Sequence, residues 1–184
     1  MKKYDVVDNV NHITFLWSDQ GDGRYSRREG LYLGHFDNLV RNFKGGSVIE
    51  FGPGTGEFAL KLMERFPITE YTIVDLAKNI GDSKKLFEQN NRRGVFIESK
   101  DYEKTFNKKY DLFVSNNCLS EVPKYYLENI FANIVPNCQC LYMFDGDADN
   151  GYNEWLILNA FKLFKEVHFV KTIYCHGIAI ACYN

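Results

Sequence analysis

Three closely spaced glycines follow a short apolar run in the sequence "VIEFGPGTGEFALKL", residues 48–62. They are Gly52, Gly54 and Gly56, and Glu50 stands just before them. The apolar run is typical of a buried strand, and "EFALKL" of the start of a helix. Glycine allows positive φ angles and a close approach of ligand to the N–H groups at a helix N-terminus. The stretch therefore predicts a ligand site; a tight structural turn is the alternative.

The spacing of the glycines narrows the class of ligand. Dinucleotide-binding turns have the pattern G-x-G-x-x-G, and phosphate-binding Walker loops have G-x-x-x-x-G-K-[ST]. This chain has G-x-G-x-G with no Lys-Ser/Thr pair after it, which disfavours an NAD-dependent dehydrogenase. Asp75 ends the apolar run "YTIVDL" nineteen positions after Gly56. A carboxylate there can accept two hydrogen bonds from a ribose diol, or it can cap the helix that follows.

Apolar runs and helical patterns alternate from residue 47 onward. We predict strands over 47–52, 70–76, 94–99, 110–117 and 139–146, with helices over 57–65, 79–90, 125–134 and 155–165. Such alternation is typical of a parallel sheet with helices on both faces. The tail reads as a hairpin of strands 166–173 and 177–184. The fold class predicted is α/β, a Rossmann-like doubly wound sheet of seven strands, mostly parallel, with an antiparallel C-terminal hairpin.

Length and composition fit one domain. The chain has 184 residues, and we predict a single domain in which residues 1–44, with a helical pattern over 29–43, cover a cofactor-binding core of residues 45–184. A net charge of −2 without a basic stripe speaks against a nucleic-acid partner. No apolar run has the length of a signal sequence or a membrane span. We therefore expect a cytoplasmic location and no membrane partner. Five cysteines without a C-x-x-C pair suggest no zinc site.

The pattern E-x-G-x-G-x-G resembles the first motif of class I, Rossmann-like, S-adenosylmethionine-dependent methyltransferases. The resemblance implies S-adenosyl-L-methionine as the cofactor. The glycines would contact its methionine part, Glu50 would help to place its ammonium group, and Asp75 would bind its ribose. The same two turns add Phe51, Pro53 and Leu76 to the implied cofactor site.

Two further stretches extend the resemblance. Asp101 and Tyr102 follow the third strand, where the family meets the adenine; a solvated loop is the alternative. "SNNCLSE", residues 115–121, is similar to the S-N-x-x-x-S-E stretch of a group of proposed sugar O-methyltransferases from bacteria and large viruses. The stretch adds Asn116, Asn117 and Ser120 to the implied cofactor site; Asn117 and Cys118 depart from the bulkier pair of that group. The proline pair of amino-methylating nucleic-acid enzymes is absent after this strand.

Three residues are candidates for the general base that a sugar hydroxyl needs. Glu121 follows the fourth strand, and it could instead simply favour the N-terminus of the next helix. His176 lies between the last two strands and has a suitable pKa for the role, although loop histidines are commonly just polar surface. Asp145 follows the fifth strand, and with Asp147 and Asp149 it could hold a divalent ion; we expect turn chemistry there and predict no metal.

The N-terminal stretch "WSDQGDGRYSRR" is expected to bring Trp17, Arg24 and Tyr25 over the cofactor, with an aromatic ring to stack on the sugar substrate; a plain surface loop is the alternative. The resemblance implies methyl transfer from S-adenosylmethionine to a sugar hydroxyl of a glycan or nucleotide-sugar. Two alternatives stay open: another small-molecule acceptor, or a methyltransferase-like subunit without catalysis. A homodimer or a glycan-processing enzyme is the expected protein partner.

Overall fold

The computed structural model describes residues 36, 39–145, 151–171 and 178–184. The segment 1–44 that was predicted to cover the core therefore lies almost entirely outside the described residues. So does the connection between the last two strands. Among the residues that are described, no helix is long and apolar enough to cross a membrane.

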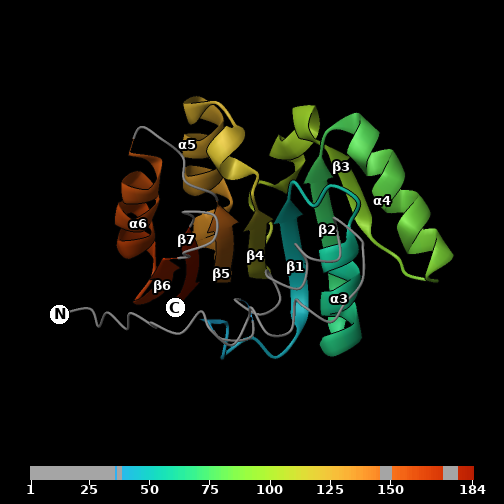
Figure 1. Cartoon of the computed structure of the whole chain (residues 1–184), viewed down its shortest axis with the longest axis horizontal. Helices are drawn as coiled ribbons and strands as arrows, with labels where there is room; N and C mark the ends of the chain where they lie inside the picture. Colours follow the sequence, from blue (N-terminus) through green and yellow to red (C-terminus); the bar gives the residue numbers. More distant parts are fainter. Residues whose placement is uncertain (1–35, 37–38, 146–150, 172–177) are drawn as a thin grey trace.

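Seven strands form one sheet in the order β3-β2-β1-β4-β5-β7-β6 (Figure 1). β1 to β5 are parallel, and β7 runs antiparallel to both of its neighbours, β5 and β6. This confirms the predicted fold class, including the antiparallel C-terminal hairpin. The strands are β1 (Gly46–Phe51), β2 (Ile68–Asp75), β3 (Val95–Glu98), β4 (Tyr110–Asn116), β5 (Cys138–Asp145), β6 (Glu166–Lys171) and β7 (Ile178–Tyr183).

Helices connect the strands and cover the sheet. The α-helices are α3 (Glu57–Arg65), α4 (Ala77–Gln89), α5 (Lys124–Asn133) and α6 (Tyr152–Leu163). The polar stretch after β3, too irregular in sequence for an α-helix, forms the 3-10 helix η1 (Ser99–Thr105). Two shorter 3-10 turns, η2 (Leu119–Glu121) and η3 (Val135–Asn137), flank α5.

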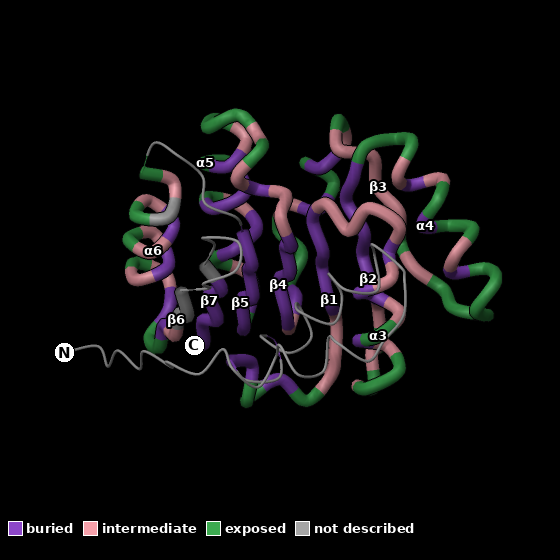
Figure 2. The backbone as a smooth tube through the Cα atoms, viewed as in Figure 1, coloured by how far each residue is buried: buried purple, intermediate pink, exposed green. Residues whose placement is uncertain are grey.

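The two faces of the sheet bury separate apolar clusters. Side chains alternate along a strand, so Val48 belongs to one cluster and Ile49 to the other. The first cluster packs under α3 and α4, and the second under α5 and α6. Because both faces are covered, the central strands are buried almost throughout, as the tube in Figure 2 shows. This double burial explains why they read as continuous apolar runs in the sequence.

The strand order places the carboxyl ends of the central strands together. β1 lies between β2 and β4, and the chain leaves β1 toward β2 but returns to β1's other side with β4. The register pairs Phe51 at the end of β1 with Val74 and Ser115. Ligands of open α/β sheets bind in the crevice at such a switch point. The glycine turn after β1 opens onto this crevice.

Candidate cofactor and acceptor site

The glycine turn has the backbone geometry that its sequence predicts. Gly52, Gly54 and Gly56 have φ angles of 69°, 62° and 87°, in the left-handed region that side chains disfavour. The Gly52 N–H donates to the carbonyl of Val74 at 2.9 Å, which fixes the turn to β2. A Cβ on Gly52 would collide with Cys118, whereas one on Gly54 would meet no atom within 4 Å. The turn is therefore packed on one side and open on the other, as a ligand cradle requires.

Asp75 joins this turn to the end of β2. Its Oδ2 accepts a hydrogen bond from the Gly54 N–H at 2.9 Å. Its Oδ1 accepts from the Leu76 N–H at 2.7 Å and from Nδ2 of Asn79 at 3.0 Å. Leu76, not Asp75, is the N-cap of α4. The carboxylate thus faces the glycine turn, where a ribose diol could reach it.

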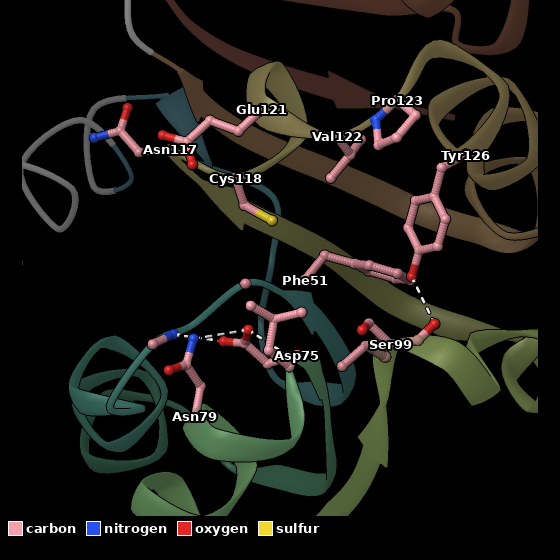
Figure 3. Close-up of a pocket in the computed structure, with 14 residues that line it drawn as sticks. Phe51, Asp75, Asn79, Ser99, Asn117, Cys118, Glu121, Val122, Pro123 and Tyr126 are labelled. Carbon is pink, nitrogen blue, oxygen red and sulfur yellow. Dashed lines mark hydrogen bonds between the residues drawn. The ribbon is translucent and has the colours of Figure 1, made fainter.

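A pocket of about 430 Å³ opens at this point. Its size lies in the range usual for small-molecule sites. Figure 3 shows Asp75, Asn79, Asn117 and Glu121 toward one side and Val122, Pro123 and Tyr126 toward the other. The pocket thus combines a polar end with an apolar end. The residues that line it are Phe51, Gly52, Gly54, Val74, Asp75, Leu76, Asn79, Ser99, Asn117, Cys118, Glu121, Val122, Pro123 and Tyr126.

Glu50 lies beneath the glycine turn and is fully buried. Its Oε2 accepts a hydrogen bond from the Tyr71 hydroxyl at 2.7 Å, while its Oε1 has no partner among the described residues. Burial raises the pKa of Glu50 to about 8, with the Tyr71 hydroxyl and the nearby Asn116 amide opposing the rise. Asn116, at the end of β4, is 8% exposed, and neither of its amide atoms makes a hydrogen bond of normal geometry with the described residues. Glu50 and Asn116 therefore lie close together, and neither is among the residues that line the pocket.

Asp145 sits at the end of β5 in a closed hydrogen-bond network. Its Oδ1 accepts from the Ser120 hydroxyl at 2.9 Å, and its Oδ2 accepts from the Tyr152 hydroxyl at 2.8 Å. Burial raises the pKa of Asp145 to about 6, and these hydrogen bonds oppose the rise. The network links β5, η2 and α6. Neither Asp145 nor Ser120 lines the pocket. Their hydrogen bond holds η2 in place next to it.

Glu121, in contrast, is exposed and lines the pocket. It belongs to η2, the turn that Ser120 anchors to Asp145. Of the two described candidates for the general base, only Glu121 borders the pocket. His176 is the third candidate and lies outside the described residues, as do Trp17, Arg24, Tyr25, Asp147 and Asp149. Within the described part of the chain, no group of three or more His, Cys, Asp or Glu side chains is arranged to hold a metal ion.

The residues predicted to meet the adenine, Asp101 and Tyr102, do not line the pocket. The Asp101 carboxylate pairs with Nζ of Lys104 at 3.0 Å on the surface. Tyr102 is buried, and its ring packs against Tyr126 with the ring centroids 4.1 Å apart. Instead, Ser99 borders the pocket, and its carbonyl accepts a hydrogen bond from the Tyr126 hydroxyl at 3.0 Å.

The sequence reasoning missed several lining residues. They come from the end of β2 and from the segments that follow β2, β3 and β4, and only the fold brings them together. Their one sequence signal is position: Val74 is the penultimate residue of β2, and the others follow the carboxyl end of β2, β3 or β4 by at most ten residues. They are Val74, Asn79, Ser99, Cys118, Val122, Pro123 and Tyr126.

A family model described as a methyltransferase domain matches residues 26–170. The chain belongs to this methyltransferase family. The match covers the glycine turn, the end of β2 and the segment after β4, which are the parts that build the pocket. None of the curated proteins matches the sequence.

Solved methyltransferase structures share the fold. A candidate O-methyltransferase from Nostoc punctiforme superposes with a TM-score of 0.67 at 15% identity, covering 87% of this chain and 58% of its own. An O-methyltransferase family protein from Burkholderia thailandensis gives 0.66 at 13% identity, covering 86% and 58%. The mitomycin 7-O-methyltransferase MmcR gives 0.59 at 11% identity, covering 94% and 60%. The chain therefore spans less than two thirds of each of these proteins, and at such identities the likeness shows the fold alone.

The methyltransferase family implies S-adenosylmethionine, and the residues present fit it. Gly54 leaves an open cradle beside the Asp75 carboxylate. Glu50 and Asn116 add polar groups at the ends of β1 and β4, next to the pocket lining residues Phe51 and Asn117. The apolar end of the pocket can accept a flat base. The resemblance to sugar O-methyltransferases in particular stays a prediction, because none of the three proteins named above is described as acting on a sugar.

Proposed function

We propose that this methyltransferase binds S-adenosylmethionine in the pocket at the ends of β1, β2 and β4 and methylates a sugar hydroxyl. The observation that best supports the proposal is the hydrogen bond from the Gly54 N–H to the Asp75 carboxylate, which holds this carboxylate beside the open glycine turn. Three features support hydroxyl methylation: the heptapeptide 115–121, the O-methyltransferase neighbours in fold, and an acid beside the pocket. The acceptor would be a glycan or a nucleotide-sugar.

The bound cofactor supplies an electrophilic methyl group on a sulfonium. The protein's part is to bind, orient and exclude water. Good orientation of reacting groups can contribute roughly 7–11 kcal/mol to lowering a barrier. Asp75 would accept hydrogen bonds from the ribose diol, and Leu76, which is 63% exposed, would offer apolar contact to the adenine. Glu50 and Asn116 would receive the polar groups of the methionine end.

Glu121 is the described residue best placed to take the proton from an attacking hydroxyl. Its carboxylate borders the pocket and is exposed, so an acceptor entering from solvent can reach it. General-base assistance is typically worth ~10²–10⁴-fold in rate. Asp145 is less suited because it is fully buried and does not line the pocket.

The test is methyl transfer from S-adenosylmethionine carrying a tritiated methyl group. Separate reactions contain neutral oligosaccharides, nucleotide-sugars, catechols and primary amines, with product identified by mass spectrometry. We expect label in a sugar, and we expect Glu121→Gln to lower kcat without weakening S-adenosylhomocysteine binding. Label only in a catechol or an amine would replace the sugar assignment. No transfer to any acceptor, with intact cofactor binding, would favour a subunit that needs a partner.

A further inference from the structure

The helix α6 carries apolar residues on its outer side as well as on the side that packs on the sheet. It covers the end of the sheet where β6 is the edge strand (Figure 1). Leu156 and Ala160 on its inner side are fully buried. Leu158 on its outer side is 53% exposed, and Trp155 and Phe161 beside it are only partly buried. In Figure 2 the side of α6 toward the sheet is purple, and the outer side is pink and green. Surface helices usually turn polar residues outward, so these exposed apolar residues indicate a contact surface.

The outer face of α6 is symmetric about Leu158. Trp155 lies three residues before Leu158 and Phe161 three residues after it, so an aromatic ring flanks the leucine on each side. Glu154 lies four residues before the leucine and Lys162 four residues after it, and both are exposed. Positions three and four residues apart share one face of a helix. From one end to the other, the face therefore carries an acid, an aromatic, a leucine, an aromatic and a base.

The acid and the base of this face do not pair with each other. Glu154 and Lys162 are eight residues apart, which separates them by about 12 Å along the helix axis. Within the described part of the chain, neither residue takes part in an ion pair. The Lys162 ammonium group makes one long hydrogen bond of 3.5 Å, to Oδ1 of Asn159 in the same helix. Both charges are therefore available to a partner protein.

We propose that this partner is a second copy of the chain, and that the two α6 helices pack antiparallel about a twofold axis at Leu158. In a twofold interface one surface patch must complement itself. Antiparallel packing sets Glu154 opposite Lys162 of the partner subunit, and the axis repeats this pair. It also sets Trp155 against Phe161 of the partner subunit. Parallel packing would instead bring like charges together, so the order of residues selects the antiparallel arrangement.

Sedimentation velocity of the full chain over a concentration series tests the inference. We expect a monomer–dimer equilibrium with a dissociation constant in the micromolar range, because an interface built on one helix is smaller than that of a permanent dimer. Glu154→Lys and Lys162→Glu each set like charges opposite one another at two places. We expect each to weaken dimerisation at least tenfold while leaving the circular dichroism spectrum and the thermal midpoint unchanged. Glu88→Lys makes the same charge change on the exposed side of α4, far from α6 (Figure 1), and should leave dimerisation unchanged.

An equimolar mixture of Glu154→Lys and Lys162→Glu is the sharper test. The first variant carries two bases on this face and the second carries two acids, so a mixed dimer regains both ion pairs. We expect the mixture to dimerise at least tenfold more tightly than either variant alone. A wild type that stays monomeric at every concentration would overturn the inference, and would leave the face to another segment of the chain or to a different protein. A dimer that neither variant weakens, or a mixture no tighter than its components, would also overturn it. None of these outcomes bears on the cofactor assignment, because no residue of α6 lines the pocket.

Discussion

Replacing Glu50 by Gln should change how stability depends on pH. In the folded protein burial raises the pKa of Glu50 from 4.5 to about 8. Folding therefore favours the protonated acid, and its contribution to stability is fully present below about pH 4.5 and is lost as the pH rises toward 8. The loss is about 1.4 kcal/mol per pH unit within that window and levels off above it. Between about pH 6 and pH 9 it amounts to roughly 3 kcal/mol.

Urea unfolding of the wild type and Glu50→Gln across this range is the assay. Gln has nearly the same shape, keeps an oxygen to accept from the Tyr71 hydroxyl, and does not ionise. The difference in unfolding free energy between the two proteins isolates the ionisation of Glu50, because the raised pKa values of Asp145 and of the buried cysteines are common to both. We expect the wild type to lose roughly 3 kcal/mol relative to the variant between about pH 6 and pH 9. Parallel curves would refute the conclusion that buried Glu50 is protonated near neutral pH.

Three further variants test the site. Gly52→Ala should destabilise by roughly 2–4 kcal/mol in thermal or urea unfolding, because its φ is 69° and its Cβ would strike Cys118; an unchanged midpoint would contradict this. Tyr152→Phe removes one of the two hydroxyls that donate to the buried Asp145 carboxylate and should cost about 1–3 kcal/mol near pH 7; wild-type stability would show that the network is dispensable. Tyr126→Phe removes the hydrogen bond to the Ser99 carbonyl and should lower the free energy of unfolding by about 1 kcal/mol. It should also weaken S-adenosylhomocysteine binding severalfold by calorimetry; an unchanged affinity would show that Tyr126 and Ser99 lie outside the cofactor site.

The sheet was predictable because its strands are buried on both faces. Continuous apolar runs such as "SVIEF" and "YTIVD" mark β1 and β2, and the glycine turn and Asp75 follow them directly. These features depend on local sequence. Even the antiparallel hairpin could be predicted from two apolar runs with a short connection.

The side of the pocket formed by Tyr126 and Ser99 could not be predicted in this way. Tyr126 belongs to the first turn of α5, and its hydroxyl reaches a carbonyl 27 residues earlier in the chain. Nothing local marks Ser99 as its partner, whereas Asp101, which has the residue type expected beside adenine, pairs with Lys104 and does not line the pocket. Likewise, the hydrogen bonds that occupy Asp145 come from two other elements. Side-chain direction and long-range partners decide these roles, and residue type alone does not show them.

The central claim is that the glycine turn and Asp75 form a site for S-adenosylmethionine. Calorimetric titration with S-adenosylhomocysteine, beside NAD and an Asp75→Ala variant, tests it most directly. The account predicts micromolar binding of S-adenosylhomocysteine, no binding of NAD, and at least a tenfold loss in the variant, about 1.4 kcal/mol. Binding of NAD instead, or no binding of S-adenosylhomocysteine by the folded protein, would contradict it.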